Sequence, residues 1–333
     1  MTATYMHPVK DDAYRKEIEI LRILSEHREP IGSIVIRSEL FRRGFLLSDR
    51  AIRYHLKILE ERGLVRGVGV EGRIITDKGL EELRRALAYE RVGSVLTKYL
   101  SLAYRVTYDL DDESGNVVAN VMVVNKDYKG RIIEVLKLLK DKDLLPAPYY
   151  RILDGGEEYR GIYAPEGKVV AFTVCNLTLD GILIHSGVPL ILKYGGLVQF
   201  IDYKPIRFTE LIAYEGTTIP PLEIFVYRRM TSIMRYVDSG SGLIPANLRE
   251  IPMEAYDKVK EIIDVLHGKG WRGIVAFGKP NEPILGIPIS MDRFGLSMVG
   301  GLIPSAALAE IGVSVDIFAP HLIVPIEDME CIV

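Results

Sequence analysis

The sequence predicts an α+β protein in which a small helical domain with one β-hairpin precedes a larger mixed domain. Residues 1–92 show helical apolar periodicity and then a hairpin pattern with glycines at its turn. From Gly93 onward, β-rich runs alternate with amphipathic helical stretches. At 333 residues the chain exceeds the usual size of a single core. We therefore expect an N-terminal domain over 1–92 and a second domain over 93–333.

Composition describes an ordinary globular protein, with 48% apolar and 26% charged residues. The longest weakly polar stretch, Leu296–Ala309, contains Pro304 and is too short to cross a bilayer, so we expect no membrane association. The first ten residues lack the apolar run of a secretory signal. Cys175 and Cys331 lie too far apart for a metal cluster or a disulfide framework. A cytoplasmic protein without a bound metal or cofactor is expected.

Positive charge is concentrated near the N-terminus. Residues 1–92 hold 18 basic and 15 acidic residues, which leaves 24 basic and 30 acidic residues of the totals of 42 and 45 for the remainder. Within Arg37–Arg73 there are 9 basic and 5 acidic residues. This distribution favours a local contact with phosphates over a protein that coats nucleic acid along its whole surface.

Two helices are predicted at the start of the N-terminal domain. Lys10–Glu26 carries apolar residues at helical spacing, and Pro30 ends that segment. Gly32-Ser33 offers a cap for a second helix over Ile34–Arg43, and Gly44 closes it in the way that glycine closes many helices.

A third predicted helix, Asp49–Arg62, has the pattern of a DNA-recognition helix. Ser48 caps its first turn, and Gly63 follows its last. One face is apolar, and the opposite face carries donors that suit base edges or phosphates. The candidate DNA contacts on this helix are Ser48, Arg50, Arg53, Tyr54 and Lys57. A charged face alone is typical of any surface helix, so the interpretation depends on the segment after Gly63.

That segment has the pattern of a short hairpin. Leu64–Val68 and Arg73–Thr76 are predicted strands around the turn Gly69-Val70-Glu71-Gly72, whose glycines suit a tight wing. Arg66 and Arg73 then flank the wing tip near DNA, which adds them to the candidate contacts. The succession of helices and hairpin predicts a winged helix-turn-helix DNA-binding domain.

The pattern resembles the ribonuclease R-type winged-helix module, a family that also occurs in transcriptional regulators. The matching residues are Pro30, Gly44, Ser48, Ile52, Arg53, Tyr54, Leu56, Leu59, Gly63, Leu64, Gly72, Arg73, Ile75, Thr76, Gly79 and Glu82-Leu83. The resemblance implies a double-stranded DNA operator as partner. A winged helix used for protein contacts is the alternative.

The second domain is predicted to be mixed α+β. Amphipathic helices are expected at Lys129–Lys140 and at 255–267, and the helix after the wing, Asp77–Arg91, leads into a lever over 77–100 between the domains. The predicted strands are Ala103–Leu110, Val117–Asn125, Tyr149–Leu153, Lys168–Cys175, Gly181–Ile184, Leu190–Leu192 and Leu197–Asp202.

The sequence of this domain also suggests an internal pseudo-repeat. The helices at 129–140 and 255–267 are followed by V-A-F at 170–172 and 275–277, and then by short Gly/Pro matches spaced 99 or 100 residues apart. This echo suggests two similar halves, with a ligand site in the crevice between them.

Three segments of the stretch Lys168–Val315 are distinctive: F-T-V-C-N-L-T-L-D-G-I-L (172–183), R-F-T-E-L-I-A-Y-E-G-T-T-I-P-P-L-E-I-F (207–225) and V-G-G-L-I-P-S-A-A-L-A-E-I-G-V (299–313). In these segments the stretch resembles the nitrogen-regulatory domain of the archaeal NrpR repressors. The resemblance implies a homodimeric repressor of nitrogen-assimilation genes that 2-oxoglutarate releases from its operator, with a PII-type signalling protein as a further partner. It also implies that this domain binds the effector and forms the dimer.

A dicarboxylate effector needs fixed cations and polar donors in a partly desolvated cleft. The candidates within the resembling segments are Thr173, Cys175, Asn176, Lys193, Arg207, Thr209, Arg249 and Arg293. In the alternative interpretation Arg207 and Arg249 pair with Glu210, Glu250 or other acids, and Cys175 is a small buried apolar residue.

Three classes of function remain to be compared. A ligand-responsive transcriptional regulator fits the winged helix and the resemblance, and it responds either to 2-oxoglutarate or to a different small acid or a partner protein. An enzyme on a small carboxylic acid is disfavoured, since no catalytic triad, metal cluster or dinucleotide motif stands out. An adaptor whose winged helix binds protein is the third class.

Overall fold

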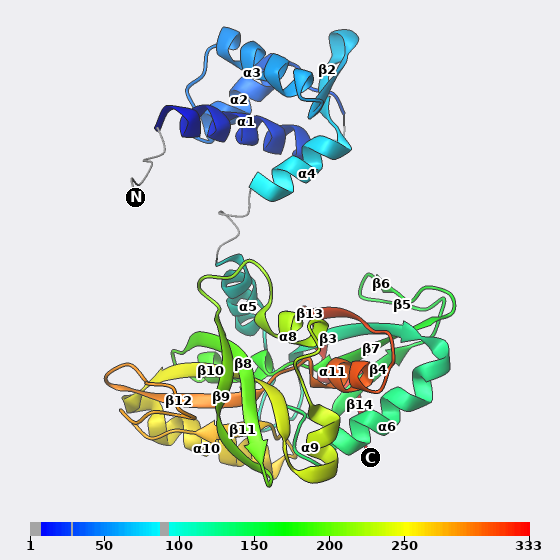
Figure 1. The fold of residues 1–333 in the computed structure, drawn as a ribbon, viewed down its shortest axis with the longest axis vertical. Helices are drawn as coiled ribbons and strands as arrows, with labels where there is room; N and C mark the ends of the chain where they lie inside the picture. Colours follow the sequence, from blue (N-terminus) through cyan, green and yellow to red (C-terminus); the bar gives the residue numbers. More distant parts are fainter. Residues whose placement is uncertain (1–7, 28, 87–92) are drawn as a thin grey trace, which may run out of the picture. The chain divides into compact units, whose positions relative to one another are not determined.

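The computed structural model describes residues 8–27, 29–86 and 93–333 of the chain. The chain divides into two compact units, Met1–Arg91 and Val92–Val333, which we call the head and the body (Figure 1). The head combines helices with a hairpin, and the body is a mixture of helices and sheets, so the predicted α+β class is confirmed. None of the described helices is long and apolar enough to cross a lipid bilayer.

The head is a winged helix. Its elements are α1 (Pro8–Glu26), α2 (Ser33–Arg42), α3 (Asp49–Glu61), β1 (Val65–Val68), the short 3₁₀ turn η1 (Gly69–Glu71), β2 (Gly72–Ile75) and α4 (Asp77–Ala86). The predicted second and third helices and both strands are confirmed to within one residue. Apolar side chains of α1, α2 and α3, with Leu64, Val65 and Leu83, form one buried core.

The wing packs tightly on the segment before α2. Ile31 and Arg73 exchange two backbone hydrogen bonds of 3.0 Å, which adds a third short strand to the hairpin. Gly72 has φ of +122°, and a Cβ there would lie 2.3 Å from the carbonyl carbon and oxygen of Ile31. Glycine is therefore required at this position by both backbone conformation and space.

The prediction of one helix over 77–100 is wrong. Helix α4 is described as far as Ala86, and α5 begins at Ser94. Gly93 adopts a left-handed conformation with φ of +78°, so a continuous helix cannot pass through it. The end of the predicted helix Asp77–Arg91 falls on 87–92, which lie outside the described residues.

The body consists of two five-stranded sheets with helices around them (Figure 1). Its helices are α5 (Ser94–Tyr104), α6 (Lys129–Lys140), α7 (Leu177–His185), α8 (Pro221–Tyr227), α9 (Ile233–Ser239), α10 (Tyr256–Gly268) and α11 (Ile303–Glu310). One sheet has the order β13 (Asp316–Pro325), β3 (Asn116–Asn125), β7 (Lys168–Val174), β4 (Tyr149–Leu153) and β14 (Glu330–Cys331). The other has the order β11 (Ile274–Phe277), β12 (Arg293–Val299), β10 (Gly242–Pro252), β8 (Ile191–Ile201) and β9 (Lys204–Ala213). A small separate hairpin is formed by β5 (Glu158–Tyr159) and β6 (Ile162–Tyr163).

The element order of the body repeats. The series β3-α6-β4-β7-α7-β8 is followed by β10-α10-β11-β12-α11-β13. The last strand of each half pairs with the first strand of the other, β8 with β10 and β13 with β3. This reciprocal pairing locks the two halves together.

Two similar halves were predicted, but most of the matches were wrong. The helices at 129–140 and 255–267 correspond, as α6 and α10. The V-A-F at 170–172 lies in β7, whereas that at 275–277 lies in β11, the counterpart of β4. The strand pairing shows which residues are equivalent. Lys168 of β7 lies opposite Asn125 of β3, and Arg293 of β12 lies opposite Pro252 of β10. Equivalent residues of β7 and β12 are therefore 125 positions apart in the sequence.

Two predicted strands are also wrong. Ala103 and Tyr104 belong to α5, and 105–110 form no strand. The N–H groups of Thr107 and Asp109 donate to backbone carbonyls at the start of β3 and in the loop before it, but these two bonds do not form a β-ladder. Gly181–Ile184 belongs to α7, which is buried nearly all round. A helix that is apolar on every side has no helical periodicity in its sequence, so it resembles a buried strand. The separate strands predicted at 190–192 and 197–202 form one strand, β8.

Candidate functional site

The solvent face of α3 carries cationic and aromatic side chains. The hydroxyl of Ser48 accepts a hydrogen bond of 3.3 Å from the Ala51 N–H, so the predicted cap is present. Arg50, Arg53, Tyr54 and Lys57 are all exposed. Arg53 donates to the Asp49 carbonyl at 3.2 Å, and Lys57 lies 3.7 Å from Glu61. The face that the sequence predicts for DNA is thus open to solvent.

The two wing arginines differ from each other. Arg66 is exposed and forms no hydrogen bond or ion pair with the residues that the structure describes. Arg73 is half-buried, and its Nε and Nη2 donate to Glu60 Oε2 at 3.2 and 3.1 Å. Glu60 Oε1 accepts from the Gly67 N–H at 3.0 Å. Arg73 therefore fixes the wing to α3, and its guanidinium is paired with Glu60. Its predicted contact with DNA stays a prediction.

The head also exposes apolar side chains that sequence analysis did not single out. Ile34, Phe41 and Leu46 are 70, 66 and 82% exposed and line an open groove between α2 and the turn before α3. The arginines beside the groove are neutralised, Arg37 by Asp49 and Arg43 by acids of α1.

The body contains a small polar cavity where its two halves meet. The first turns of α7 and α11 line it, together with side chains from β3, β8, β10, α5 and α8. The lining residues are Tyr99, Asn120, Cys175, Asn176, Leu177, Leu192, Tyr214, Leu222, Asn247, Arg249, Gly301 and Leu302. The volume is about 20 Å³, enough for one water molecule. A larger ligand can enter only if the halves move apart.

Asparagines bind the halves together around this cavity. Asn120 Nδ2 of β3 donates to the Gly301 carbonyl at 3.0 Å, and Asn176 Nδ2 donates to the Val299 carbonyl at 2.7 Å. Asn247 Oδ1 of β10 accepts from the Tyr214 hydroxyl. The helix N-termini also present positive ends of their dipoles to the cavity, which favours an anion there.

Arg249 is a fully buried cation in the cavity wall. Its Nε and Nη2 donate to Asp180 of α7 at 2.6 and 2.8 Å, and both side chains are 0% exposed. Nη1 makes only a contact of 3.5 Å with the Asn247 carbonyl. Burial opposes the charge, but the carboxylate of Asp180 outweighs it, so the pKa of Arg249 lies above its ordinary value. The alternative interpretation that Arg249 pairs with an acid is confirmed, and the acid is Asp180, not Glu250.

Other ionisable groups in the wall are neutral. Burial raises the pKa of the Cys175 thiol to about 12 and raises that of the Tyr214 hydroxyl well above its ordinary value. Both groups present hydrogen-bonding dipoles without charge at neutral pH. Arg249 is then the charged residue that lines the cavity.

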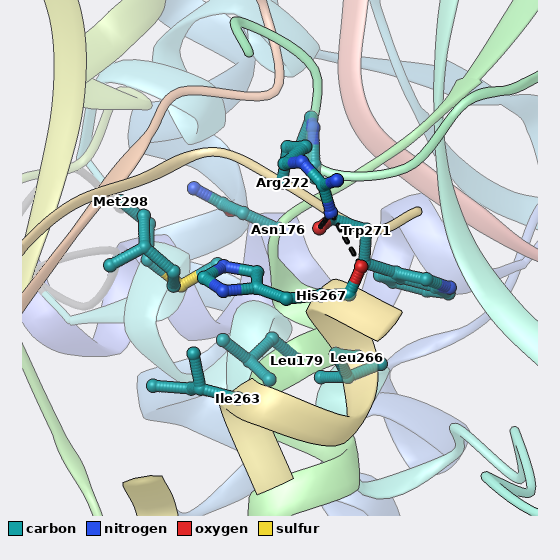
Figure 2. A pocket seen from close by; sticks show the side chains of 10 residues that line it. Asn176, Leu179, Ile263, Leu266, His267, Trp271, Arg272 and Met298 are labelled. Atoms are coloured by element: carbon teal, nitrogen blue, oxygen red, sulfur yellow. Dashed lines mark hydrogen bonds between the residues drawn. The ribbon is translucent and has the colours of Figure 1, made fainter. Parts of the chain in front are cut away.

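A second cavity, of about 10 Å³, adjoins Asn176 on its other side (Figure 2). It is lined by α10 residues, Trp271, Arg272 and Met298. Arg272 Nη1 donates to the His267 carbonyl at 2.7 Å. Asn176 is a lining residue of both cavities.

The eight predicted effector residues do not share one site. Cys175, Asn176 and Arg249 line the cavity, and Thr173 lies opposite Asn120 on β7 without lining it. Lys193 lies 3.9 Å from Glu250, and Thr209 donates to the Leu197 carbonyl at 3.3 Å. Arg207 is exposed on β9 and donates to Gln199, not to Glu210. Arg293 is at the start of β12, the end opposite to the cavity. No group of residues with metal-binding geometry exists in the described part of the chain.

Sequence reasoning missed Asp180, Tyr214 and the two strand asparagines. A signal was present: Ala-Asn occurs at 119–120 and again at 246–247, in β3 and in its counterpart β10. Together, the winged head and the polar cavity between two halves of the body define a winged-helix transcriptional regulator with a potential ligand site.

Comparisons with known proteins identify the family. Residues 18–83 match the ribonuclease R winged-helix domain, and residues 92–331 match the NrpR regulatory domains NRD1 and 2. The global nitrogen regulator NrpRI of Methanosarcina mazei is 37% identical over 302 residues, which cover 91% of this chain and 93% of that protein. The global nitrogen regulator NrpR of Methanocaldococcus jannaschii is 35% identical over 96% of this chain, which spans 55% of that longer protein.

A solved structure agrees with this result. A nitrogen repressor-like protein from Methanococcus jannaschii superposes with a TM-score of 0.61 at 30% identity, covering 72% of this chain and 98% of that one. The chain therefore belongs to the NrpR family, whose curated relatives are named as regulators and not as enzymes.

Proposed function

We propose that this protein is a DNA-binding repressor of nitrogen-assimilation genes that 2-oxoglutarate releases from its operator. The exposed cationic face of α3, backed by an apolar core, is the observation that carries DNA binding. The names of the relatives as global nitrogen regulators support the choice of target genes.

The effector proposal is supported by the cavity of the body. A carboxylate there would meet the guanidinium of Arg249, the neutral hydroxyl of Tyr214 and two helix N-termini. Because the closed cavity holds no more than a water, the effector must select a more open arrangement of the two halves. A coupling of ~1–3 kcal/mol would then change operator affinity ~5- to 150-fold.

The active form is proposed to be a homodimer. Two heads would read two half-sites about one turn of DNA apart, or a multiple of that spacing. A PII-type signalling protein is proposed as a further partner on the basis of the family resemblance.

The test is fluorescence anisotropy of a labelled glutamine synthetase promoter fragment, titrated with the full chain with and without 2-oxoglutarate. We expect tight binding that weakens with 2-oxoglutarate, whereas glutamate, its amine counterpart, leaves it unchanged. Binding to DNA without any response to 2-oxoglutarate would remove this effector and favour a different small acid. Absence of DNA binding would favour the adaptor class.

A further inference from the structure

The buried pair Arg249–Asp180 occupies a position that the body contains twice. Asn247 of β10 corresponds to Asn120 of β3, so Arg249, two residues later, corresponds to Met122. Asp180 and Ser305 are also equivalent. Asp180 is the fourth residue counted from Leu177 at the start of α7, and Ser305 is the fourth counted from Leu302, which directly precedes α11. Ser305 Oγ lies 3.5 Å from Met122 Sδ. The same contact between a strand of one half and a helix of the other is therefore ionic in one of its two copies and nearly apolar in the second.

This difference argues that the fold does not need the ion pair. Met122 and Ser305 are buried, just as Arg249 and Asp180 are. Transfer of two charges out of water carries a large free-energy cost, so a buried ion pair is weak evidence for a stabilising role. A specific use of the charge would explain why only one of the two equivalent contacts carries it.

The geometry indicates what this use is. Arg249 lines the cavity, whereas Asp180, which binds its guanidinium, does not. A carboxylate that enters the cavity meets the same cation that Asp180 neutralises. Two carboxylates compete for one guanidinium, and the bidentate geometry can serve only one of them fully.

Displacement of Asp180 would be transmitted to α5. The next residue, Gly181, packs against the end of α5 so closely that a Cβ would lie 2.4 Å from the Ala103 carbonyl oxygen and from Val106 Cβ. His185 Nε2 also lies 2.8 Å from the Tyr104 carbonyl oxygen. Since α7 cannot shift without moving α5, and α5 is the first described element after the head in the sequence, the start of the body would respond.

We propose that an effector carboxylate takes the place of Asp180 on Arg249, and that the released α7 moves α5. This inference rests on the proposed effector response and specifies how that response is produced. Arg249 is then the ligand-binding cation, and Asp180 is an internal competitor that sets the effector concentration at which the repressor is released.

The test compares variants by one ratio, the operator Kd with 2-oxoglutarate divided by that without it. The double variant Asp180→Ser with Arg249→Met reproduces the equivalent Met122–Ser305 pair and should reduce the ratio to about one. Asp180→Asn removes only the competitor, so its half-maximal 2-oxoglutarate concentration should fall by ~10-fold, an effect in the direction opposite to simple damage. Met122→Leu, in the equivalent position of the other half, is the matched control and should respond as the wild type does.

Thermal unfolding with and without 2-oxoglutarate provides a second readout for variants that fold less well. Here 2-oxoglutarate should raise the Tm of Asp180→Asn by more than that of the wild type. If 2-oxoglutarate affects the wild type, and the double variant and Asp180→Asn respond to the same extent as the wild type, the competition is disproved while the proposed function stands. If the wild type itself is insensitive to 2-oxoglutarate, the proposed effector fails, and this inference fails with it.

Discussion

Glu60 of the recognition helix and Arg73 of the wing hold each other in place. Glu60 Oε2 accepts two hydrogen bonds from Arg73, and Oε1 accepts one from the Gly67 N–H, so a single carboxylate joins α3 to both strands of the hairpin. The pair is partly exposed, and its direct contribution to stability is therefore under about 1 kcal/mol. Its proposed role is to fix the angle between the wing and the helix that reads DNA.

We predict that Glu60→Ala weakens operator binding although it removes a negative charge from the DNA side. Loss of the negative charge alone would strengthen the attraction to phosphates. A higher Kd in anisotropy titrations would therefore report that the wing has lost its orientation. Glu61→Ala is the control, because it removes the same charge one residue away and leaves the wing contacts intact. Binding that strengthens equally in both variants would show that the wing needs no such anchor.

Arg53→Ala is predicted to reduce operator affinity by ~5- to 150-fold, the value of one good base contact of ~1–3 kcal/mol. The side chain is exposed and bonds only to its own helix at Asp49, so folding and self-association should be unaffected. Gel shift measures the affinity, and analytical ultracentrifugation measures the assembly. Unchanged operator affinity would exclude this face of α3 as the reader.

The wing arginine Arg66 is predicted to contact phosphate. Arg66→Ala should make the slope of log Kobs against log salt less negative by about 0.9 and weaken all DNA sequences alike. Arg73→Ala should leave that slope unchanged, because its charge is already satisfied by Glu60. A change of slope in the second variant, and none in the first, would reverse these assignments.

The Arg249–Asp180 pair predicts strongly non-additive stability. Arg249→Met or Asp180→Ser alone leaves one buried charge without its partner and should cost about 3–5 kcal/mol. The double variant removes both charges and should recover most of that loss, as measured by denaturant unfolding. Additive losses would mean that the two side chains do not act as a pair.

The two cysteines are predicted to differ in reactivity. Burial raises the pKa of Cys175 to about 12, so its thiolate fraction at pH 8 is on the order of 10⁻⁴. Cys331 is exposed. A thiol reagent should therefore modify one cysteine in the native protein and two in denaturant, and Cys331→Ser should abolish the fast reaction. Because burial disfavours the thiolate, the folded state loses stability as pH rises from the unfolded pKa of about 8.5 toward 12, whereas below that range the shift has no effect on stability.

The head was predictable because its signals are local. Ser48, Gly44 and the glycines of the wing mark helix and turn boundaries through backbone chemistry that needs no distant partner. The break in the predicted helix over 77–100 was not predictable in the same way. The left-handed Gly93 interrupts a stretch whose composition still suits a helix. Pairing of Arg73 with Glu60 depends on how the hairpin folds back onto α3, which spacing alone does not give.

The body was less predictable because its elements are buried on all sides. Helix α7 has no polar face, so Gly181–Ile184 resembled a strand. Of the effector candidates, Cys175, Asn176 and Arg249 meet because the halves exchange their last strands, a long-range arrangement without a local signal. The partner Asp180 was missed since a buried acid inside an apolar run cannot be paired from sequence.

The account depends most on the claim that the front of α3 lies on DNA and leaves it when the effector binds. Tyr54 is 63% exposed on that front and can be replaced by the photocrosslinker p-benzoylphenylalanine. We predict that this variant crosslinks to operator DNA on irradiation and that 2-oxoglutarate reduces the yield, while the same replacement of the exposed Tyr104 on the body gives no crosslink. No crosslink from position 54 under conditions in which the chain protects its operator would contradict the account.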